Sequence, residues 1–282
     1  MTRRIAFLAA LLLAAHAAAA EPPRRIVSLS PTVTEMLYGV GAFDRVVGVS
    51  NYCTYPAAVQ SLPRVGGWHN PSLEKLAALR PDLVIVGDAQ APFVEDKLRE
   101  LGIAVLITPG RSVEDVFKAI EAIGRAVGKE KAAASLTAST RETLDRIRRK
   151  TAQFSKPRVL LVVDRTPGTL RDLYTATEGS FLAELIEIAG GQVVAPPAAS
   201  GYGKIGKETL LAVDPDIILD FVHGAKSRFS GDPREAWRDM PELKAVRNGR
   251  VHAVSEDYVP HASHRIALTA ALFARLIHPE AE

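Results

Sequence analysis

The stretch "GGWHNPSLEKLAALRPDLVIV", residues 66–86, recurs in similar form as "GKETLLAVDPDIILD", residues 206–220. In each copy, a short helical pattern ends at a proline, which cannot donate the hydrogen bond of a continuing helix. The apolar run that comes next suits a strand covered on both faces. Aligning the two Pro-Asp pairs places Glu74 on Glu208. The repeat therefore predicts two similar helix-and-strand units in one chain.

The sequence around each copy shows the same alternation of strand and helix. The apolar run "RIVSLS" (25–30) leads into a helical pattern between Pro31 and Gly41, and "RVLLVV" (158–163) leads into one between Ser180 and Gly190. Proline suits a first helical turn, serine a cap and glycine a helix end. Alternation of this kind predicts an α/β fold with two units, each built on a mainly parallel sheet.

Between the two units, residues 128–154 are rich in helix-forming residues and contain no proline. Apolar side chains recur there at helical spacing, at Leu136, Leu144, Ile147 and Phe154. We predict a single long helix that acts as a rigid strut between two lobes; the alternative is an ordinary crossover helix within one domain. The predicted divisions are an N-terminal α/β lobe at 21–127, a bridging helix at 128–154 and a C-terminal α/β lobe at 155–282.

The first 20 residues have the pattern of a secretory signal peptide. Two arginines precede an apolar run, and three alanines at 18–20 precede Glu21. We therefore expect a signal peptide at 1–20 and an exported, soluble protein. No cysteine follows the alanines, so we expect no lipid anchor. The one cysteine, Cys53, cannot form an internal disulfide and is interpreted as a small buried residue.

Composition and motifs argue against several classes of function. The net charge of +3 includes Arg3 and Arg4, and the chain has no long basic run, so nucleic-acid binding is not expected. The chain has no G-x-G-x-x-G opening a helix, no phosphate-binding P-loop, no G-x-S-x-G and no cysteine set for a cluster. Its histidines lack the spacing of a compact zinc motif. We expect neither an enzyme nor a resident metal, with a redox enzyme using a nucleotide or cluster as the alternative from another class.

Four stretches resemble one known family. They are "SLSPTVTEMLYGVG", "SNYCTYP" followed by "VGGWHNPSLEKLAALRPDLVI", "AWRDMPELKAVRNGRVHAV" and "DYVPHASHRIAL". Together they resemble the exported substrate-binding proteins of ABC importers for cobalamin, haem and ferric siderophores, and among these the cobalamin-binding branch. The resemblance covers essentially residues 24–282.

The family resemblance implies a fold and a function. The implied fold has two Rossmann-like lobes with mainly parallel sheets, joined by a single long α-helix. The implied function is periplasmic capture of a cobalamin-like corrinoid for an ABC permease dimer, with haem or a ferric siderophore as the alternative ligand. The corrinoid would be a transported ligand rather than a catalytic cofactor, and we expect the protein to be a monomer.

In that family, a glutamate near the start of the repeated helix in each lobe docks into arginine-rich pockets of the permease. The resemblance thus implies that Glu74 and Glu208 are permease-docking residues. Arginine and carboxylate form geometrically specific, charge-assisted hydrogen bonds, which suits such a contact. The alternative is that each glutamate only stabilises the N-terminus of its own helix.

If two α/β lobes face each other, the loops beyond the carboxyl ends of their strands line the cleft. Tyr52 and Trp68 match positions where the cobalamin branch has aromatic contacts, and Tyr202 precedes Glu208 by the same spacing as Trp68 precedes Glu74. Asp257 matches a family aspartate, which would accept hydrogen bonds from ligand amides. His261 replaces a family arginine. These five residues are the predicted ligand contacts; for the aromatic rings, core packing is the alternative.

Three histidines are candidates to approach the metal of a bound chelate. They are His69, His261 and His264, of which His264 replaces a family proline while Arg265 is kept. Imidazole can ligate cobalt or iron, and a haem ligand would need such an axial group or a tyrosine. The alternative for each is a neutral histidine that forms hydrogen bonds at the cleft rim. Trp237 is interpreted as structural.

Overall fold

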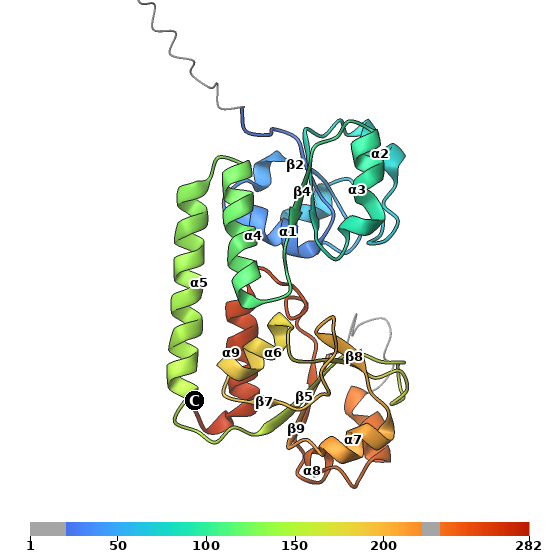
Figure 1. Cartoon of the computed structure of the whole chain (residues 1–282), viewed down its shortest axis with the longest axis vertical. Coiled ribbons are helices and arrows are strands. Elements are labelled where there is room, and N and C mark those ends of the chain that lie inside the picture. Colours follow the sequence, from blue (N-terminus) through green and yellow to red (C-terminus); the bar gives the residue numbers. More distant parts are fainter. Residues whose placement is uncertain (1–20, 222–231, 282) are drawn as a thin grey trace, which may run out of the picture.

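The computed structural model describes residues 21–221 and 232–281, so the predicted signal peptide, residues 1–20, lies outside the described residues. Figure 1 shows two lobes, one above the other, with helix α5 (Glu130–Thr151) running along one side of both. The predicted fold class, two α/β lobes joined by a single long helix, is confirmed. The helix lies inside the range predicted for it, 128–154.

The N-terminal lobe is built on a parallel sheet. In the described part of the chain this sheet has four strands in the order β2-β1-β3-β4: β1 (Ile26–Ser28), β2 (Val46–Val49), β3 (Leu83–Gly87) and β4 (Val105–Thr108). Its helices are α1 (Pro31–Gly39), α2 (Leu73–Ala78), α3 (Ala91–Glu100) and α4 (Val113–Ala126). Serine side chains accept hydrogen bonds at the N-termini of α1, α2 and α4, as the cap preference of helices predicts.

The C-terminal lobe has a mixed sheet. Its described strands follow the order β10-β9-β5-β6-β8, and β7 also pairs with β5. The strands are β5 (Arg158–Asp164), β6 (Tyr174–Ala176), β7 (Gln192–Val193), β8 (Tyr202–Lys204), β9 (Ile217–Phe221) and β10 (Val251–Val254). β6 runs antiparallel to both of its neighbours, β5 and β8, and the other pairings are parallel. The helices are α6 (Phe181–Ile188), α7 (Lys207–Val213), α8 (Lys244–Arg247) and α9 (Ile266–Ile277).

Short 3-10 helices complete the described chain: η1 (Phe43–Arg45), η2 (Ala57–Ser61), η3 (Pro233–Asp239) and η4 (Pro279–Ala281).

In the C-terminal lobe, the serine and the glycine that were predicted to begin and end a helix are the two boundaries of α6. Ser180 accepts a hydrogen bond from the N–H of Ala183, and Gly190 has a φ of 84° just past the helix end. Glycine adopts this left-handed conformation without steric penalty.

The sequence repeat corresponds to a repeated contact. Asp82, which follows the first proline, accepts a hydrogen bond from the backbone N–H of Arg25 at 2.6 Å, just before β1. Asp216 accepts in the same way from the backbone N–H of Arg158 at 2.9 Å, at the start of β5. The side chains of the two arginines also donate to a backbone carbonyl at the end of the repeated short helix. The acceptor is Leu79 at the end of α2 and Val213 at the end of α7. The aspartate therefore fixes the helix-to-strand turn against the first strand of each lobe.

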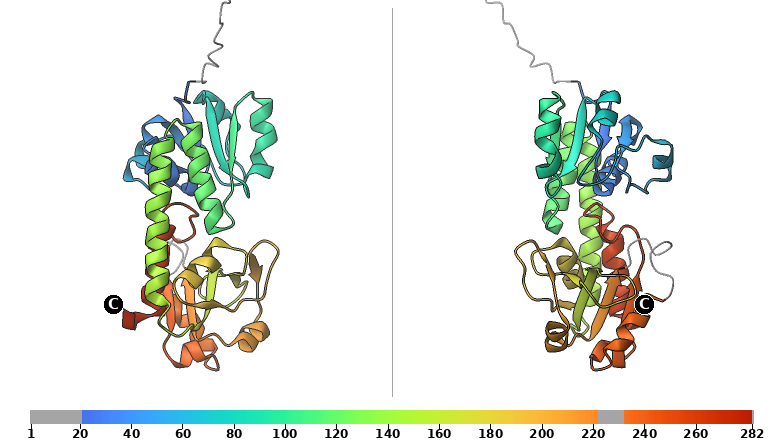
Figure 2. Two further views of the ribbon diagram at one scale, coloured as in Figure 1. Left: turned by 60° about the vertical axis from the view of Figure 1, so that its left-hand side comes forward. Right: turned by 90° about the vertical axis from the view of Figure 1, so that its right-hand side faces the viewer.

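The two lobes share one hydrophobic core on the α5 side of the molecule. Helices α4, α5, α6 and α9 pack on one another there, and the buried cluster includes Ile120, Leu144, Leu185 and Phe273. Figure 2 shows α5 against both lobes from two further directions. The lobes are thus joined by packing as well as by chain connection. None of the helices in residues 21–221 and 232–281 combines the length and apolar character that a membrane crossing requires.

Candidate functional site

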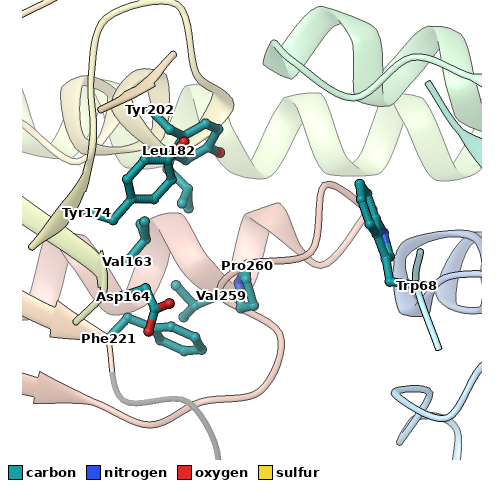
Figure 3. A pocket seen from close by; sticks show the side chains of 9 residues that line it. All are labelled: Trp68, Val163, Asp164, Tyr174, Leu182, Tyr202, Phe221, Val259 and Pro260. Carbon is teal, nitrogen blue, oxygen red and sulfur yellow. The ribbon is translucent and has the colours of Figure 1, made fainter. Parts of the chain in front are cut away.

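A cavity of about 590 Å³ lies between the lobes. Trp68 of the N-terminal lobe faces it from one side, and rings and apolar side chains of the C-terminal lobe face it from the other (Figure 3). Several lining residues lie at the carboxyl ends of β5 and β9, where loops of α/β sheets form ligand sites. The lining residues are Trp68, Val163, Asp164, Tyr174, Leu182, Tyr202, Phe221, Val259 and Pro260.

Trp68 is held on a tight loop of the N-terminal lobe. Gly66 has a φ of 115°, which only glycine adopts readily, and a Cβ there would press on the backbone of Pro71 and Ser72. Gln90 is buried, and its Nε2 donates to the carbonyl of Trp68 at 2.8 Å. The Trp68 ring also lies 4.6 Å from the ring of His69, centroid to centroid. These contacts fix the loop that carries Trp68 to the cavity.

Two tyrosines form the opposite wall. Tyr174 on β6 and Tyr202 on β8 are diagonal neighbours on one face of an antiparallel pair, so their rings stack, with centroids 6.3 Å apart and an interplanar angle of 19°. Burial raises the pKa of the Tyr202 phenol, because charge is disfavoured away from water. The phenol therefore stays neutral at ordinary pH and can donate or accept a hydrogen bond.

A second cavity, of about 630 Å³, continues from the first and shares Tyr174 and Tyr202 with it. Asp88 and Arg111 of the N-terminal lobe also line it. Arg111 donates through Nη2 to the carbonyl of Ala199 at 2.6 Å and so bridges the lobes beside the cavity. Together the two cavities present two carboxylates, one guanidinium, phenols and apolar rings on their described surface.

The chain just beyond Asp164, the last residue of β5, is fixed by a buried ion pair. Arg165, the next residue, has Nη2 2.8 Å from Asp220 Oδ2 with both side chains about 1% exposed. Trp237 donates from its indole N–H to the same carboxylate oxygen at 2.8 Å and is itself buried. Trp237 lines neither cavity, which agrees with its interpretation as a structural residue.

The structure brings two of the five predicted ligand residues, Trp68 and Tyr202, to the cavity. Tyr52 lies near the Trp68 loop but is 59% exposed and does not line the cavity. Asp257 accepts a hydrogen bond from Thr54 Oγ1 at 2.9 Å, and His261 Nδ1 lies 2.8 Å from Glu35 Oε1. Both residues are thus engaged with the N-terminal lobe, and their contact with ligand stays a prediction.

The three histidines considered for a metal differ in their surroundings. His264 is packed beside Gly39, and burial lowers the pKa of its imidazole. One ring nitrogen of His261 is paired with Glu35. His69 is exposed, and its ring makes T-shaped contacts with the rings of Trp68 and Phe93. Among the residues that the structure describes, no group of three or more His, Cys, Asp or Glu is arranged to hold a metal ion.

The two predicted docking residues occupy the same position in their helices. Glu74 is the second residue of α2 and Glu208 the second residue of α7, and both are exposed. In Figure 1, α2 and α7 lie on the side of their lobes opposite α5. The two carboxylates are therefore presented from corresponding places on the two lobes.

Some residues of the site were not predicted. Asp164 and Phe221 end the strands β5 and β9, so the strand pattern with the rule on carboxyl ends contained a signal for both. Glu35 is an acidic residue within the apolar pattern of α1, which is a signal of a buried polar contact. No strand, helix or repeat pattern in the sequence singled out Tyr174 or Gln90.

Comparison with protein families places residues 26–258 in a family described as periplasmic binding protein. An uncharacterized ABC transporter substrate-binding lipoprotein of Bacillus subtilis, YvrC, is 32% identical over 265 residues, 92% of this chain and 81% of the relative. The vitamin B12-binding protein of Vibrio cholerae is 27% identical over 245 residues, 86% of this chain and 85% of the relative.

Solved structures show the same architecture. The periplasmic vitamin B12 binding protein BtuF of Vibrio cholerae has a TM-score of 0.77 and 25% identity, covering 92% of this chain and 98% of that one. A periplasmic heme binding protein from Pseudomonas aeruginosa has a TM-score of 0.81 at 24% identity, covering 92% and 94%. At that identity the second likeness supports the fold alone.

Proposed function

The chain belongs to the periplasmic binding protein family, and from this premise we propose that it captures a cobalamin-like corrinoid between its lobes and delivers it to an ABC permease. Membership makes it a binding component of the ABC-importer type. The corrinoid is the more specific part of the proposal. Relatives that bear the name of vitamin B12-binding proteins support it.

The observation that carries the proposal is the pairing of Trp68 with Tyr174 and Tyr202 across a cavity that also contains Asp164. A flat macrocycle buries its faces against such rings, each contact adding roughly 0.5–1.5 kcal/mol beyond area burial. The amide side chains of a corrinoid donate hydrogen bonds, and Asp164 accepts them.

The charge of the cavities favours a corrinoid over haem. Asp88 and Asp164 contribute two carboxylates, and Arg111 is the one cation among the described lining residues. Haem carries two carboxylates of its own, which such a lining repels. Anionic ferric siderophores meet the same repulsion.

Titration with four probes tests the proposal. Cyanocobalamin, dicyanocobinamide, haemin and ferric enterobactin, an anionic siderophore complex, would be compared by calorimetry and by tryptophan emission. The chain has two tryptophans, and a coloured ligand quenches both by energy transfer, so Trp68→Phe measured beside the wild type assigns the part of the quenching that belongs to Trp68. We expect one-to-one binding of the two corrinoids and their release unchanged in mass. Tighter binding of haemin or ferric enterobactin would overturn the choice of ligand, and chemical turnover of any probe would favour an enzyme.

The proposal includes docking through Glu74 and Glu208 and a periplasmic location. The docking role is supported by the matching positions of Glu74 and Glu208 in their helices and by the exposure of both side chains. The periplasmic location is supported by membership of the periplasmic binding protein family. The expected absence of a lipid anchor stays a prediction, and the relative from Bacillus subtilis is named a lipoprotein.

A further inference from the structure

A buried carboxylate of the N-terminal lobe is held by side chains from the far end of the chain. Glu35 on α1 is 1% exposed. His261 Nδ1 lies 2.8 Å from its Oε1, Arg265 Nη1 donates to the same oxygen at 2.9 Å, and Ser263 Oγ donates to Oε2. All three partners belong to the segment between β10 and α9, which we call the crossover segment, residues 255–265.

The cluster extends beyond Glu35. Arg265 Nη2 lies 3.5 Å from Asp257 Oδ1, and Thr54 of the N-terminal lobe donates to the other oxygen of that carboxylate. The guanidinium of Arg265 also lies over the ring of Tyr55, 4.4 Å from its centroid. Side chains near the start and at the end of the crossover segment, Asp257 and Arg265, thus contact the N-terminal lobe, although the segment follows a strand of the C-terminal lobe.

Side-chain contacts decide the shape of this segment, because it is neither helix nor strand. Its backbone closes only local turns, such as the bond from the N–H of His261 to the carbonyl of Tyr258 at 3.1 Å. Two of its residues, Val259 and Pro260, line the cavity beside the tyrosine wall (Figure 3). The position of these two side chains therefore depends on the attachments at either end of the turn.

We propose that Glu35 is a positioning residue for ligand binding. It does not line the cavity; it holds the crossover segment so that Val259 and Pro260 complete the cavity wall. A carboxyl group removed from water needs several hydrogen-bond partners, and the segment supplies three side chains from one short stretch. The inference rests on the proposed function in taking a corrinoid as the ligand. It also gives Asp257 and His261 a role, because both help to attach the crossover segment to the N-terminal lobe.

The test compares Glu35→Gln with Glu142→Gln, an exposed carboxylate on α5. Glu35→Gln keeps the size of the side chain but removes the nearer of the two carboxylates that face Arg265, leaving the more distant Asp257. We expect amide exchange in peptides covering residues 255–265 to become about tenfold faster, a local opening, while β1 and β3 exchange as in the wild type. The dissociation constant for cyanocobalamin should rise about tenfold. Glu142→Gln should change both by no more than about twofold.

Measurements are made at a temperature where circular dichroism shows each variant folded, and a purely global loss of stability is recognised because it accelerates exchange in β1 and β3 as well. If Glu35→Gln fails to fold, Ser263→Ala removes one donor and leaves the Arg265 pair, with the same local effect expected at smaller size. Unchanged exchange in 255–265, or unchanged affinity with a corrinoid that the wild type binds, overturns the inference. Absence of corrinoid binding in the wild type counts against the proposed function instead, and the exchange result then decides the role of Glu35 by itself.

Discussion

At the scale of single residues, Gln90 organises the N-terminal side of the cavity. Its Nε2 donates to the carbonyl of Leu29 at 3.2 Å and to that of Trp68 at 2.8 Å. Among the described residues its Oε1 has no hydrogen-bond partner, so the side chain is held through its donors. Gln90 therefore links the end of β1, the start of α3 and the loop of Trp68.

We predict that Gln90→Leu weakens corrinoid binding by about three- to tenfold, because one lost hydrogen bond of roughly 1 kcal/mol frees the Trp68 loop. Calorimetry with cyanocobalamin measures the affinity, and a shift of the tryptophan emission reports the changed setting of Trp68. Gln60→Leu, at an exposed position on η2, is the control. Equal affinity and emission in the two variants would show that Gln90 does not position Trp68.

The sequence predicted the parts of the site that local patterns carry. Trp68 and Tyr202 could be predicted from the sequence because each precedes the glutamate of a repeated helix by the same number of residues. Both line the cavity. For Asp257 and His261, the sequence showed residue types suited to a ligand but not their partners. Glu35 lies more than 200 positions away in the chain, and its pairing with His261 follows from the packing of two lobes. One sequence without coordinates does not contain that contact.

At the scale of helices and strands, prediction worked best for long or strongly apolar elements. The runs "DLVIV" and "RVLLVV" became β3 and β5, and the proline-free helical pattern at 128–154 became α5. The antiparallel strands β6 and β8 were not predicted as strands. Each has three residues and includes polar or glycine positions, so no period of two is established. Their pairing is decided by neighbouring strands.

The packing of α4 on α5 makes a prediction at Gly124. A Cβ at this position would collide with the Cβ of Ala133 on α5, so the two helices approach closely only because Gly124 has no side chain. We expect Gly124→Ala to lower the free energy of unfolding by roughly 1–2 kcal/mol, since overpacking outweighs the higher helix propensity of alanine. Thermal unfolding measures this. Gly87→Ala, where nothing lies within 4 Å of the added Cβ, is the control and should change stability little. A more stable Gly124→Ala would refute the close approach.

The contact between α4 and α6 makes a prediction about pH. Glu184 on α6 accepts a hydrogen bond from the N–H of Val113, the first residue of α4, at 3.1 Å. Burial raises the pKa of the Glu184 carboxyl, and the nearby Glu187, Asp115 and Glu114 raise it further. A raised folded-state pKa gives stability that is present below the unfolded pKa and is lost as pH rises through the folded value. The ionised Glu184 therefore weakens the folded state at neutral pH.

We accordingly expect Glu184→Gln to unfold at a higher temperature than the wild type at pH 7, because the amide keeps an acceptor for Val113 and carries no charge. The difference should shrink as pH falls and vanish below about pH 4, where an unfolded glutamate is also protonated. Melting curves from pH 4 to pH 8 test this, with Glu142→Gln as an exposed control. A wild type that is more stable than the variant at pH 7 would contradict the assigned sign.

At the scale of the whole molecule, the shared core limits how far the lobes can move. Buried side chains of α4, α5, α6 and α9 form one cluster across the junction, and the Glu35 cluster and Arg111 connect the lobes beside the cavity. Wide opening would expose this apolar surface. We expect ligand binding to change the radius of gyration by less than about 1 Å. Small-angle scattering with and without cyanocobalamin measures it, and a large decrease would indicate a hinge that the shared core does not permit.

The presentation of Glu74 and Glu208 leads to the last prediction. A permease dimer offers two equivalent subunits, and two lobes with one carboxylate each match it. Glu74→Gln combined with Glu208→Gln should abolish stimulation of the permease ATPase in reconstituted vesicles, because charge-assisted contacts with arginine need the carboxylate. Affinity for cyanocobalamin should stay within about threefold, since neither residue lines the cavity.

The control for docking removes the same charge elsewhere. Glu100→Gln with Glu142→Gln changes exposed carboxylates on α3 and α5 and should leave ATPase stimulation intact. The competing interpretation, that Glu74 and Glu208 only stabilise their own helix N-termini, makes a different prediction. It requires a loss of roughly 0.3–1 kcal/mol of stability per residue with transport unimpaired. Each single variant should therefore be tested as well: two partial losses of ATPase stimulation, at unchanged ligand affinity, follow from two independent docking contacts and not from helix stabilisation.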